Sequence, residues 1–336
     1  MVLQANTVIR GKYRITRLIG DGGMGAVYEA EHLLLKVPVA LKFLHADLAE
    51  RPGLAERFLR EARVSASIQS LHVTRVTDVD TTDAGAPFLV MELLRGESLQ
   101  DLLDRQRRLP QATAIDYTLQ ILSGLEAAHA LDVVHRDLKP DNVFIVQTPG
   151  GPVLKLIDFG IAKLRNSEEF KEALTRAGAM MGTPEYMAPE QLYSAENVDA
   201  RADLFSVGVM LYEMLCGERP AAGEEPTEIV SQFVLGTIVP LQDRLHDVPE
   251  ALAQVVTRAL AAQREDRFDS AFSMRVALAP VATALSQAGA IAATPAPVPL
   301  QGTRASAIEE DPSTRRTSVA DTLPPGTDPP VKTADD

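Results

Sequence analysis

Polar residues whose types suit phosphate chemistry gather in the middle of the chain, in His135-Arg136-Asp137-Leu138-Lys139-Pro140-Asp141-Asn142 and then Asp158-Phe159-Gly160. Asp137 is a candidate base that orients an attacking hydroxyl, and Lys139 is placed to neutralise charge on a transferring phosphoryl group. Asn142 and Asp158 carry the oxygen ligands that Mg²⁺ prefers. Asp, Asn and Pro also favour turns, but the joint pattern predicts a site for phosphoryl transfer.

A glycine-rich segment near the N-terminus has the spacing G-x-G-x-x-G-x-V, in Gly20-Asp21-Gly22-Gly23-Met24-Gly25-Ala26-Val27. Glycine has no Cβ, so such a backbone can approach a phosphate closely and direct N–H groups at it. Taken alone, the pattern fits an ordinary glycine-rich hairpin equally well. A dinucleotide-binding oxidoreductase has its glycines between a strand and a helix, whereas here a second strand is predicted, which disfavours that alternative.

Lys42 ends the apolar run Val39-Ala40-Leu41-Lys42 of a predicted strand. A lysine in this setting either extends outward to solvent or reaches the α- and β-phosphates of a nucleotide. Glu61 falls on the apolar stripe of the next predicted helix, where a charge is costly unless it is paired. We therefore predict a Lys42–Glu61 ion pair.

The elements that must position these residues change character along the chain. Alternating apolar residues predict an antiparallel sheet of five strands, at 13–19, 26–30, 37–43, 73–79 and 88–94. One helix, at 54–69, is expected between the third and fourth strands. Helices predominate afterwards, at 112–131, 202–215, 229–235, 251–261 and 270–278, around a loop-rich segment at 134–189. The predicted fold class is α+β, with a small sheet followed by a larger, mainly helical part.

In this order, the motifs resemble the signature of the protein kinase family over about 13–278. The resemblance implies a two-lobed kinase domain at 13–285, with an N-lobe at 13–94 and a C-lobe at 95–285. It also implies that Lys42 binds phosphate with Glu61 as its partner, and that Asp137 is the catalytic base with Lys139 beside it. Asn142 and Asp158 are the implied metal ligands. The expected cofactors are ATP and Mg²⁺, with Mn²⁺ as an alternative metal.

The resemblance extends to the residues that surround a nucleotide and brace the site. The implied nucleotide contacts are Ile19, Gly20, Asp21, Gly22, Gly23, Gly25, Val27, Ala40, Lys42, Met91, Glu92, Leu94 and Phe144. Phe144 stands where a leucine is more usual. Glu190 is expected to pair with Arg267, and Asp203 to brace the catalytic loop. Two departures are Ser70-Leu71, in place of the usual His-Pro, and a small insertion at 147–152.

Substrate class and regulation are implied in the same way. Lys139 and Gly182-Thr183-Pro184-Glu185-Tyr186 resemble serine/threonine kinases, and Cys216-Gly217-Glu218-Arg219-Pro220 resembles their bacterial, eukaryotic-like branch. Arg136 is expected to bind a phosphate on the activation segment 161–187, with Thr175 as the first candidate acceptor and Ser167 as the second. Thr183 is expected to hydrogen-bond Asp137 and Lys139. A solvated loop threonine is the alternative for Thr175.

Two related functions compete with an active protein kinase. A pseudokinase scaffold would not need Lys42, Asp137, Asn142 and Asp158, all of which are present. A small-molecule phosphotransferase of related fold lacks an activation segment that ends in Ala-Pro-Glu, which here is Ala188-Pro189-Glu190. Both alternatives are therefore disfavoured.

Composition bounds the partners and the location of the protein. The 336 residues carry a net charge of −13, which argues against nucleic acids and anionic membranes as partners. The single cysteine, Cys216, requires no oxidising compartment, and neither a signal peptide at 1–10 nor a bilayer-spanning segment is predicted, so a cytoplasmic location is expected. Expected partners are proteins with Ser/Thr acceptors and a second copy of the chain. Residues 286–336 are expected to form a disordered tail.

Overall fold

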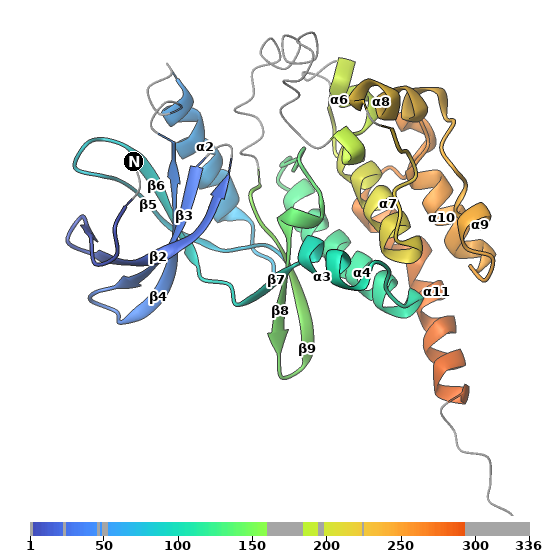
Figure 1. Cartoon of the computed structure of the whole chain (residues 1–336), viewed down its shortest axis with the longest axis horizontal. Coiled ribbons are helices and arrows are strands. Elements are labelled where there is room, and N and C mark those ends of the chain that lie inside the picture. The colour runs from blue at the N-terminus through green and yellow to red at the C-terminus, as the bar shows by residue number, and fades with distance from the viewer. Residues whose placement is uncertain are drawn as a thin grey trace, which may run out of the picture. The chain divides into compact units, whose positions relative to one another are not determined.

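The computed structural model describes residues 3–22, 25–45, 48, 53–159, 184–193, 198–223 and 225–292. Figure 1 shows how the elements of this part of the chain are arranged. The predicted tail therefore lies outside the described residues from position 293 onward.

The first sheet contains six antiparallel strands in the order β1-β2-β3-β4-β6-β5. The strands are β1 (Val8–Ile9), β2 (Tyr13–Gly22), β3 (Gly25–His32), β4 (Val37–Leu44), β5 (Val76–Thr81) and β6 (Pro87–Glu92). Five of them were predicted, whereas the two-residue β1 is too short to show a period. One face of the sheet buries an apolar cluster that includes Tyr13, Ile15, Tyr28, Leu41 and Phe88.

A change of register in β2 decides which side chains reach the opposite face of the sheet. The pairing of β2 with β3 is irregular between Ile15 and Arg17, so Ile15 is buried in the apolar cluster while Arg17 lies directly opposite Glu29. Because directly opposite residues share a face, the register places Arg17, Glu29, Ala40 and Met91 in one row. The simple alternation predicted for 13–19 therefore breaks at this bulge.

Helix α2 (Leu54–Ser67) covers part of that opposite face. Its apolar stripe contributes Leu54, Phe58 and Ala62 to a buried cluster with Leu44 and Leu89 of the sheet. The predicted helix at 54–69 is thus confirmed within two residues at its end.

A small second sheet and the remaining helices follow (Figure 1). The sheet contains β7 (Gly96–Ser98), β8 (Val143–Thr148) and β9 (Gly151–Leu156), and the supposed insertion at 147–152 is the turn of the β8–β9 hairpin. The helices are α3 (Leu99–Gln106), α4 (Gln111–His129), α6 (Pro189–Tyr193), α7 (Arg201–Cys216), α8 (Pro226–Leu235), α9 (Leu241–Arg244), α10 (Glu250–Ala259) and α11 (Ala271–Ala292). As its apolar sequence predicted, α7 is buried along nearly its whole length, and it packs against α4 and α10.

Helix α11 is longer than the segment 270–278 that the sequence predicted, because it continues through Pro280 to Ala292. Proline removes a backbone hydrogen bond within a helix, but Pro280 lies on the exposed side, where water can bond the released carbonyl. Leu278 and Val281 are buried and hold the helix on the core. Residues 286–292 of the predicted tail are therefore part of α11. Among the helices that the structure describes, none combines the length and apolar character needed to cross a bilayer.

Candidate active site

The loop at 135–142 is anchored by one buried carboxylate at the start of α7. Asp203 accepts hydrogen bonds from the backbone N–H groups of His135 (2.8 Å) and Arg136 (2.9 Å). It also contacts Nε2 of His129 at 2.8 Å. Burial raises the pKa of Asp203, but the hydrogen bonds and positive charge from the two histidines outweigh burial, so its pKa lies below the ordinary value. The expectation that Asp203 braces the loop is confirmed.

Arg136 adopts a backbone conformation that non-glycine residues rarely use. Its φ is 67°, a left-handed conformation that costs about 1–3 kcal/mol. The strain is offset by Asp203 and by Gln191, whose amide donates to the carbonyl of Arg136 at 2.8 Å. The guanidinium donates to the carbonyl of Val198 at 3.4 Å, while its buried Nε has no hydrogen-bond partner among the described residues.

Asn142 holds Asp137 in place within one tight turn. The amide nitrogen of Asn142 donates to the backbone carbonyl of Asp137 at 2.7 Å and approaches its carboxylate at 3.3 Å. Because the nitrogen is used in this way, the amide oxygen of Asn142 is the atom that can serve as a metal ligand. Lys139 lies in the same turn and is half-buried.

Lys42 joins the first sheet to the segment that follows β9. Its ammonium contacts Oδ1 of Asp158 at 2.5 Å, and its side chain is only 8 % exposed. The neighbouring Ile157 donates its backbone N–H to the carbonyl of Asn142 at 3.0 Å, so the segment with Asp158 runs beside the 135–142 loop. Glu61 lies in α2, but its side chain is outside the described part of the structure, so the Lys42–Glu61 pair stays a prediction.

These contacts bring together the four residues on which the sequence argument depends. Lys42 meets Asp158, and Asn142 meets Asp137, while the backbone bond from Ile157 links the two pairs. A bound magnesium ion usually uses one or two carboxylates together with substrate phosphates. The carboxylate of Asp158 and the amide oxygen of Asn142 are hard oxygen donors of this kind, so the residues fit the metal.

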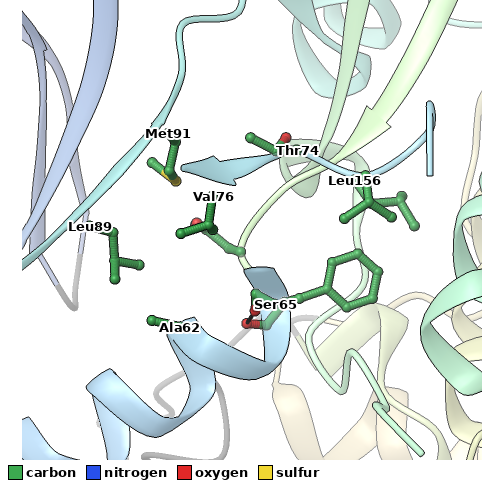
Figure 2. Close-up of a pocket in the computed structure, with 10 residues that line it drawn as sticks. Ala62, Ser65, Thr74, Val76, Leu89, Met91 and Leu156 are labelled. Atoms are coloured by element: carbon green, nitrogen blue, oxygen red, sulfur yellow. Dashed lines mark hydrogen bonds between the residues drawn. The ribbon is translucent and has the colours of Figure 1, made fainter. Parts of the chain in front are cut away.

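A small cavity of about 20 Å³ lies behind Met91, between α2 and the Asp158-Phe159 segment. Figure 2 shows Ala62 and Ser65 of α2 facing Leu89 and Met91 across it. The hydroxyl of Ser65 donates to the backbone carbonyl of Phe159 at 3.2 Å, which fixes α2 to the segment that carries Asp158. Helix α2 and the segment that carries Asp158 are therefore in direct contact.

A larger cavity of about 480 Å³ lies between the first sheet and β8. Of the predicted nucleotide contacts, seven line it: Ile19, Val27, Ala40, Met91, Glu92, Leu94 and Phe144. Asp158 also lines it, so the cavity reaches one of the predicted metal ligands. Its size and its mostly apolar lining with a few polar groups are typical of a small-molecule site.

The glycine-rich segment forms a hairpin between β2 and β3, with Gly22 opposite Gly25 and Gly20 opposite Val27. Gly25 cannot be replaced without a shift, because a Cβ there would lie 1.9 Å from the carbonyl oxygen of Phe43. Both flanks are strands, as predicted, which differs from the strand–helix context of a dinucleotide site. Asp21 lies at the tip of the hairpin, on an exposed stretch.

Several predicted residues lie outside the described residues: Gly23, Gly160, Ser167, Thr175 and Thr183. Conversely, the cavity is also lined by residues that sequence reasoning missed, namely Arg17, Glu29, Thr74, Leu93, Arg95, Gly96 and Ile157. Arg17 was missed because the bulge in β2 reverses the alternation. Glu29 has a signal in the sequence, because it lies two residues after Val27 on the same strand and must share its face.

Glu190 and Arg267 form the expected ion pair. Two guanidinium nitrogens of Arg267 donate to the two carboxylate oxygens of Glu190, at 2.7 and 2.9 Å, and the Arg267 side chain is fully buried. This bidentate pair fixes the start of α6 to the segment between α10 and α11.

Comparison with known proteins agrees with this geometry. The protein kinase domain family matches residues 13–276. Serine/threonine-protein kinase pkn2 of Myxococcus xanthus is 38 % identical over 307 residues, which cover 91 % of this chain and 36 % of that protein. Serine/threonine-protein kinase Pkn1 of the same organism is 40 % identical over 269 residues, covering 80 % of this chain and 38 % of that protein. The chain thus spans less than half the length of these relatives.

Among solved structures, the kinase domain of Mycobacterium tuberculosis PknI is similar with a TM-score of 0.63 and 26 % identity, over 83 % of this chain and 99 % of that one. The chain belongs to the protein kinase family. The predicted α+β, two-lobed kinase fold is confirmed, as is the resemblance to bacterial serine/threonine kinases.

Proposed function

We propose that this chain is a serine/threonine protein kinase that transfers the γ-phosphate of ATP to hydroxyl groups of proteins, including its own. The observation that carries the proposal is the meeting of Lys42 with Asp158 and of Asn142 with Asp137, beside a cavity of nucleotide size. The relatives' names as serine/threonine-protein kinases support the acceptor class.

In the proposed reaction, the cavity holds the nucleotide and Lys42 contacts its phosphates. Magnesium, held by Asp158 and Asn142, would supply charge neutralisation on the phosphate oxygens. Asp137 orients the acceptor hydroxyl and takes its proton. The hydroxyl oxygen forms a bond to the γ-phosphorus while the bond from that phosphorus to the β-phosphate oxygen breaks, and ADP leaves.

The test is Asp137→Asn beside Asp141→Asn as a matched control. Asp141 lies in the same turn but is exposed. With Mg-ATP and casein, we expect Asp137→Asn to lose about 100-fold or more of the transfer rate, because the positioned base and its charge are removed. ADP binding should be retained, and Asp141→Asn should stay near wild type. Transfer by Asp137→Asn at the wild-type rate would reject the proposal.

We also propose that Arg136 receives a phosphate placed on Thr175 by a neighbouring molecule. The buried Nε of Arg136 supports this, because a guanidinium in that setting is suited to an anion. Phosphopeptide mapping in the same reactions tests it, and an unmodified Thr175 in fully active enzyme would reject it. A cytoplasmic location is proposed on the ground that Cys216 is the single cysteine.

A further inference from the structure

Among the charged side chains that line the cavity assigned to the nucleotide, Arg17, Glu29 and Arg95 are joined by two ion pairs. We call them the rim triad. Arg17 lies on β2 and Glu29 on β3, while Arg95 lies in the segment between β6 and β7. The triad therefore gathers residues from the sheet above the cavity and from the linker that leads out of the sheet.

Glu29 is the centre of this triad. Its register places it in the row with Ala40 and Met91, so it projects from the cavity face of the sheet. Its side chain is 14 % exposed, whereas those of Arg17 and Arg95 are 65 % and 74 % exposed. A largely buried carboxylate beside apolar walls is costly unless it is paired, and the two arginines supply that pairing from the solvent side.

The two ion pairs differ in what they connect. Glu29 Oε2 meets Nη2 of Arg17 at 2.8 Å, and these residues are directly opposite on adjacent strands. Glu29 Oε1 meets Nη2 of Arg95 at 3.8 Å, and Arg95 follows Leu94 in the linker. The first pair is internal to the sheet, whereas the second joins the sheet to the linker.

We propose that Glu29 is a positioning residue for the nucleotide, which holds the linker against the sheet through Arg95 and so raises nucleotide affinity. This inference rests on the proposed function, because it takes the cavity as the nucleotide site. The linker carries Leu94, and the sheet carries Val27 and Ala40, so the pair sets the distance between two walls of the cavity. We assign the triad to nucleotide binding alone, whereas phosphoryl transfer itself is assigned to Lys42 and Asp137.

The test measures ADP binding to the full chain by titration calorimetry, for Glu29→Gln, Arg95→Gln and the double variant. Exposed ion pairs are weak, so each single variant should raise the Kd measurably but by no more than about fivefold. The double variant should bind no more weakly than Glu29→Gln, because Glu29→Gln has already removed the contact with Arg95. In transfer assays, KM for ATP should rise while kcat stays unchanged.

The charge changes separate positioning from simple attraction of an anionic ligand. Glu29→Gln removes one negative charge from the protein, and Arg95→Gln removes one positive charge. Electrostatic attraction of the anionic ADP alone would therefore tighten binding in the first variant and weaken it in the second. The matched control is Glu31→Gln, which makes the same charge change on the same strand. Glu31 pairs with Arg14 (3.1 Å) and Lys36 (3.6 Å), away from the linker, so its ADP binding should match wild type.

Three results would overturn the inference: tighter ADP binding by Glu29→Gln, additive losses in the double variant, or a fall in kcat without a change in KM. Thermal unfolding without nucleotide establishes that each variant is folded before binding is compared. If the wild-type chain itself bound no ADP, the proposed function would fail instead, and the two failures are therefore distinguishable.

Discussion

At the scale of single residues, the site is built from conformations and charges that would be unfavourable in isolation. Arg136 and Asp158 both have left-handed backbones, with φ of 67° and 63°. Each costs about 1–3 kcal/mol and persists only where neighbouring contacts fix it. Asp203 fixes the first and Lys42 contacts the side chain of the second. Two of the left-handed non-glycine residues of the described structure therefore lie next to or within the predicted catalytic set.

Glu213 is a half-buried carboxyl group whose ionisation opposes folding. It lies on α7 and accepts a hydrogen bond from the hydroxyl of Tyr186 at 2.5 Å. Burial raises its pKa above the ordinary value of 4.5, although the Tyr186 bond and the charge of Arg219 act against this. As pH rises, the unfolded chain therefore loses this proton first. The stability that protonated Glu213 contributes is full below pH 4.5 and is lost as pH rises through the folded pKa.

Glu213→Gln should show this dependence directly, because glutamine keeps an acceptor for Tyr186 but cannot ionise. We expect the free energy of unfolding of the variant, relative to wild type, to increase from pH 4 to pH 7 in urea denaturation. The control Glu218→Gln removes an exposed carboxylate, 59 % exposed, and should change stability by no more than about 0.5 kcal/mol. A constant or falling difference for Glu213→Gln would contradict the assignment.

At the scale of elements, the contact between α4 and the segment at 70–74 helps to position β9, the strand that leads to Asp158. Here Ser70-Leu71 replaces the usual His-Pro, and the hydroxyl of Ser70 accepts the backbone N–H of His72 at 3.1 Å. The carbonyl of His72 accepts a hydrogen bond from the backbone N–H of Leu156 at 2.9 Å, and the N–H of Thr74 donates to the carbonyl of Leu156 at 2.9 Å. The departure from the usual motif is therefore met by a local serine turn, and β9 is still held two residues before Asp158.

Gly124→Ala tests this contact. Alanine is favoured over glycine in a helix by about 1 kcal/mol, but its Cβ would lie 2.8 Å from the carbonyl oxygen of His72 and 3.0 Å from Leu156. Overfilling a close-packed contact costs about 1–3 kcal/mol, and here backbone must move. We expect a net loss of about 1–2 kcal/mol in chemical denaturation. Ser123→Ala, on the same turn but half-buried, should be neutral or slightly stabilising; equal behaviour of the two variants would refute this account.

At the scale of the whole molecule, α11 closes the core of the helical part. Buried Leu278 and Val281, together with partly buried Leu285, pack against the same apolar cluster as α4 and α7. The matched family ends at residue 276, before these contacts are complete. We therefore propose that the kinase domain includes α11 to Ala292.

Two truncated chains distinguish a domain that ends near residue 276 from one that extends to Ala292. A chain that ends at Ala292 should keep the unfolding temperature and transfer rate of the full chain. A chain that ends at Ala279 loses the buried Val281 and the partly buried Leu285. Full burial of such a side chain is worth about 1.5–3 kcal/mol and partial burial less, so this chain should be destabilised by about 2–4 kcal/mol. Thermal unfolding and the casein assay provide the measurements. Equal stability of the two truncated chains would place the boundary before Pro280.

Many of the elements and several local contacts of the site could be predicted from the sequence, because they depend on the spacing of residues close together in the chain. The turn that joins Asp137 to Asn142 spans five positions, and backbone geometry alone brings such residues together. The strands β2 to β6 and the central helix α7 follow from apolar periodicity. The order of the motifs then identified the family, and with it the Glu190–Arg267 pair.

Only the tertiary structure decided which residues distant in the sequence are in contact, and on which face of the sheet a side chain lies when strand register is irregular. Lys42 and Asp158 are 116 positions apart and are in contact because the fold places β4 beside the segment that follows β9. The bulge in β2 turned Arg17 toward Glu29, and no periodicity signals such a shift. Pro280 remained helical because packing of Leu278 and Val281 outweighs the lost backbone bond. The spacing of neighbouring residues is set by the chain itself, whereas the face on which a side chain lies and the distant residue that it contacts are set by the tertiary fold.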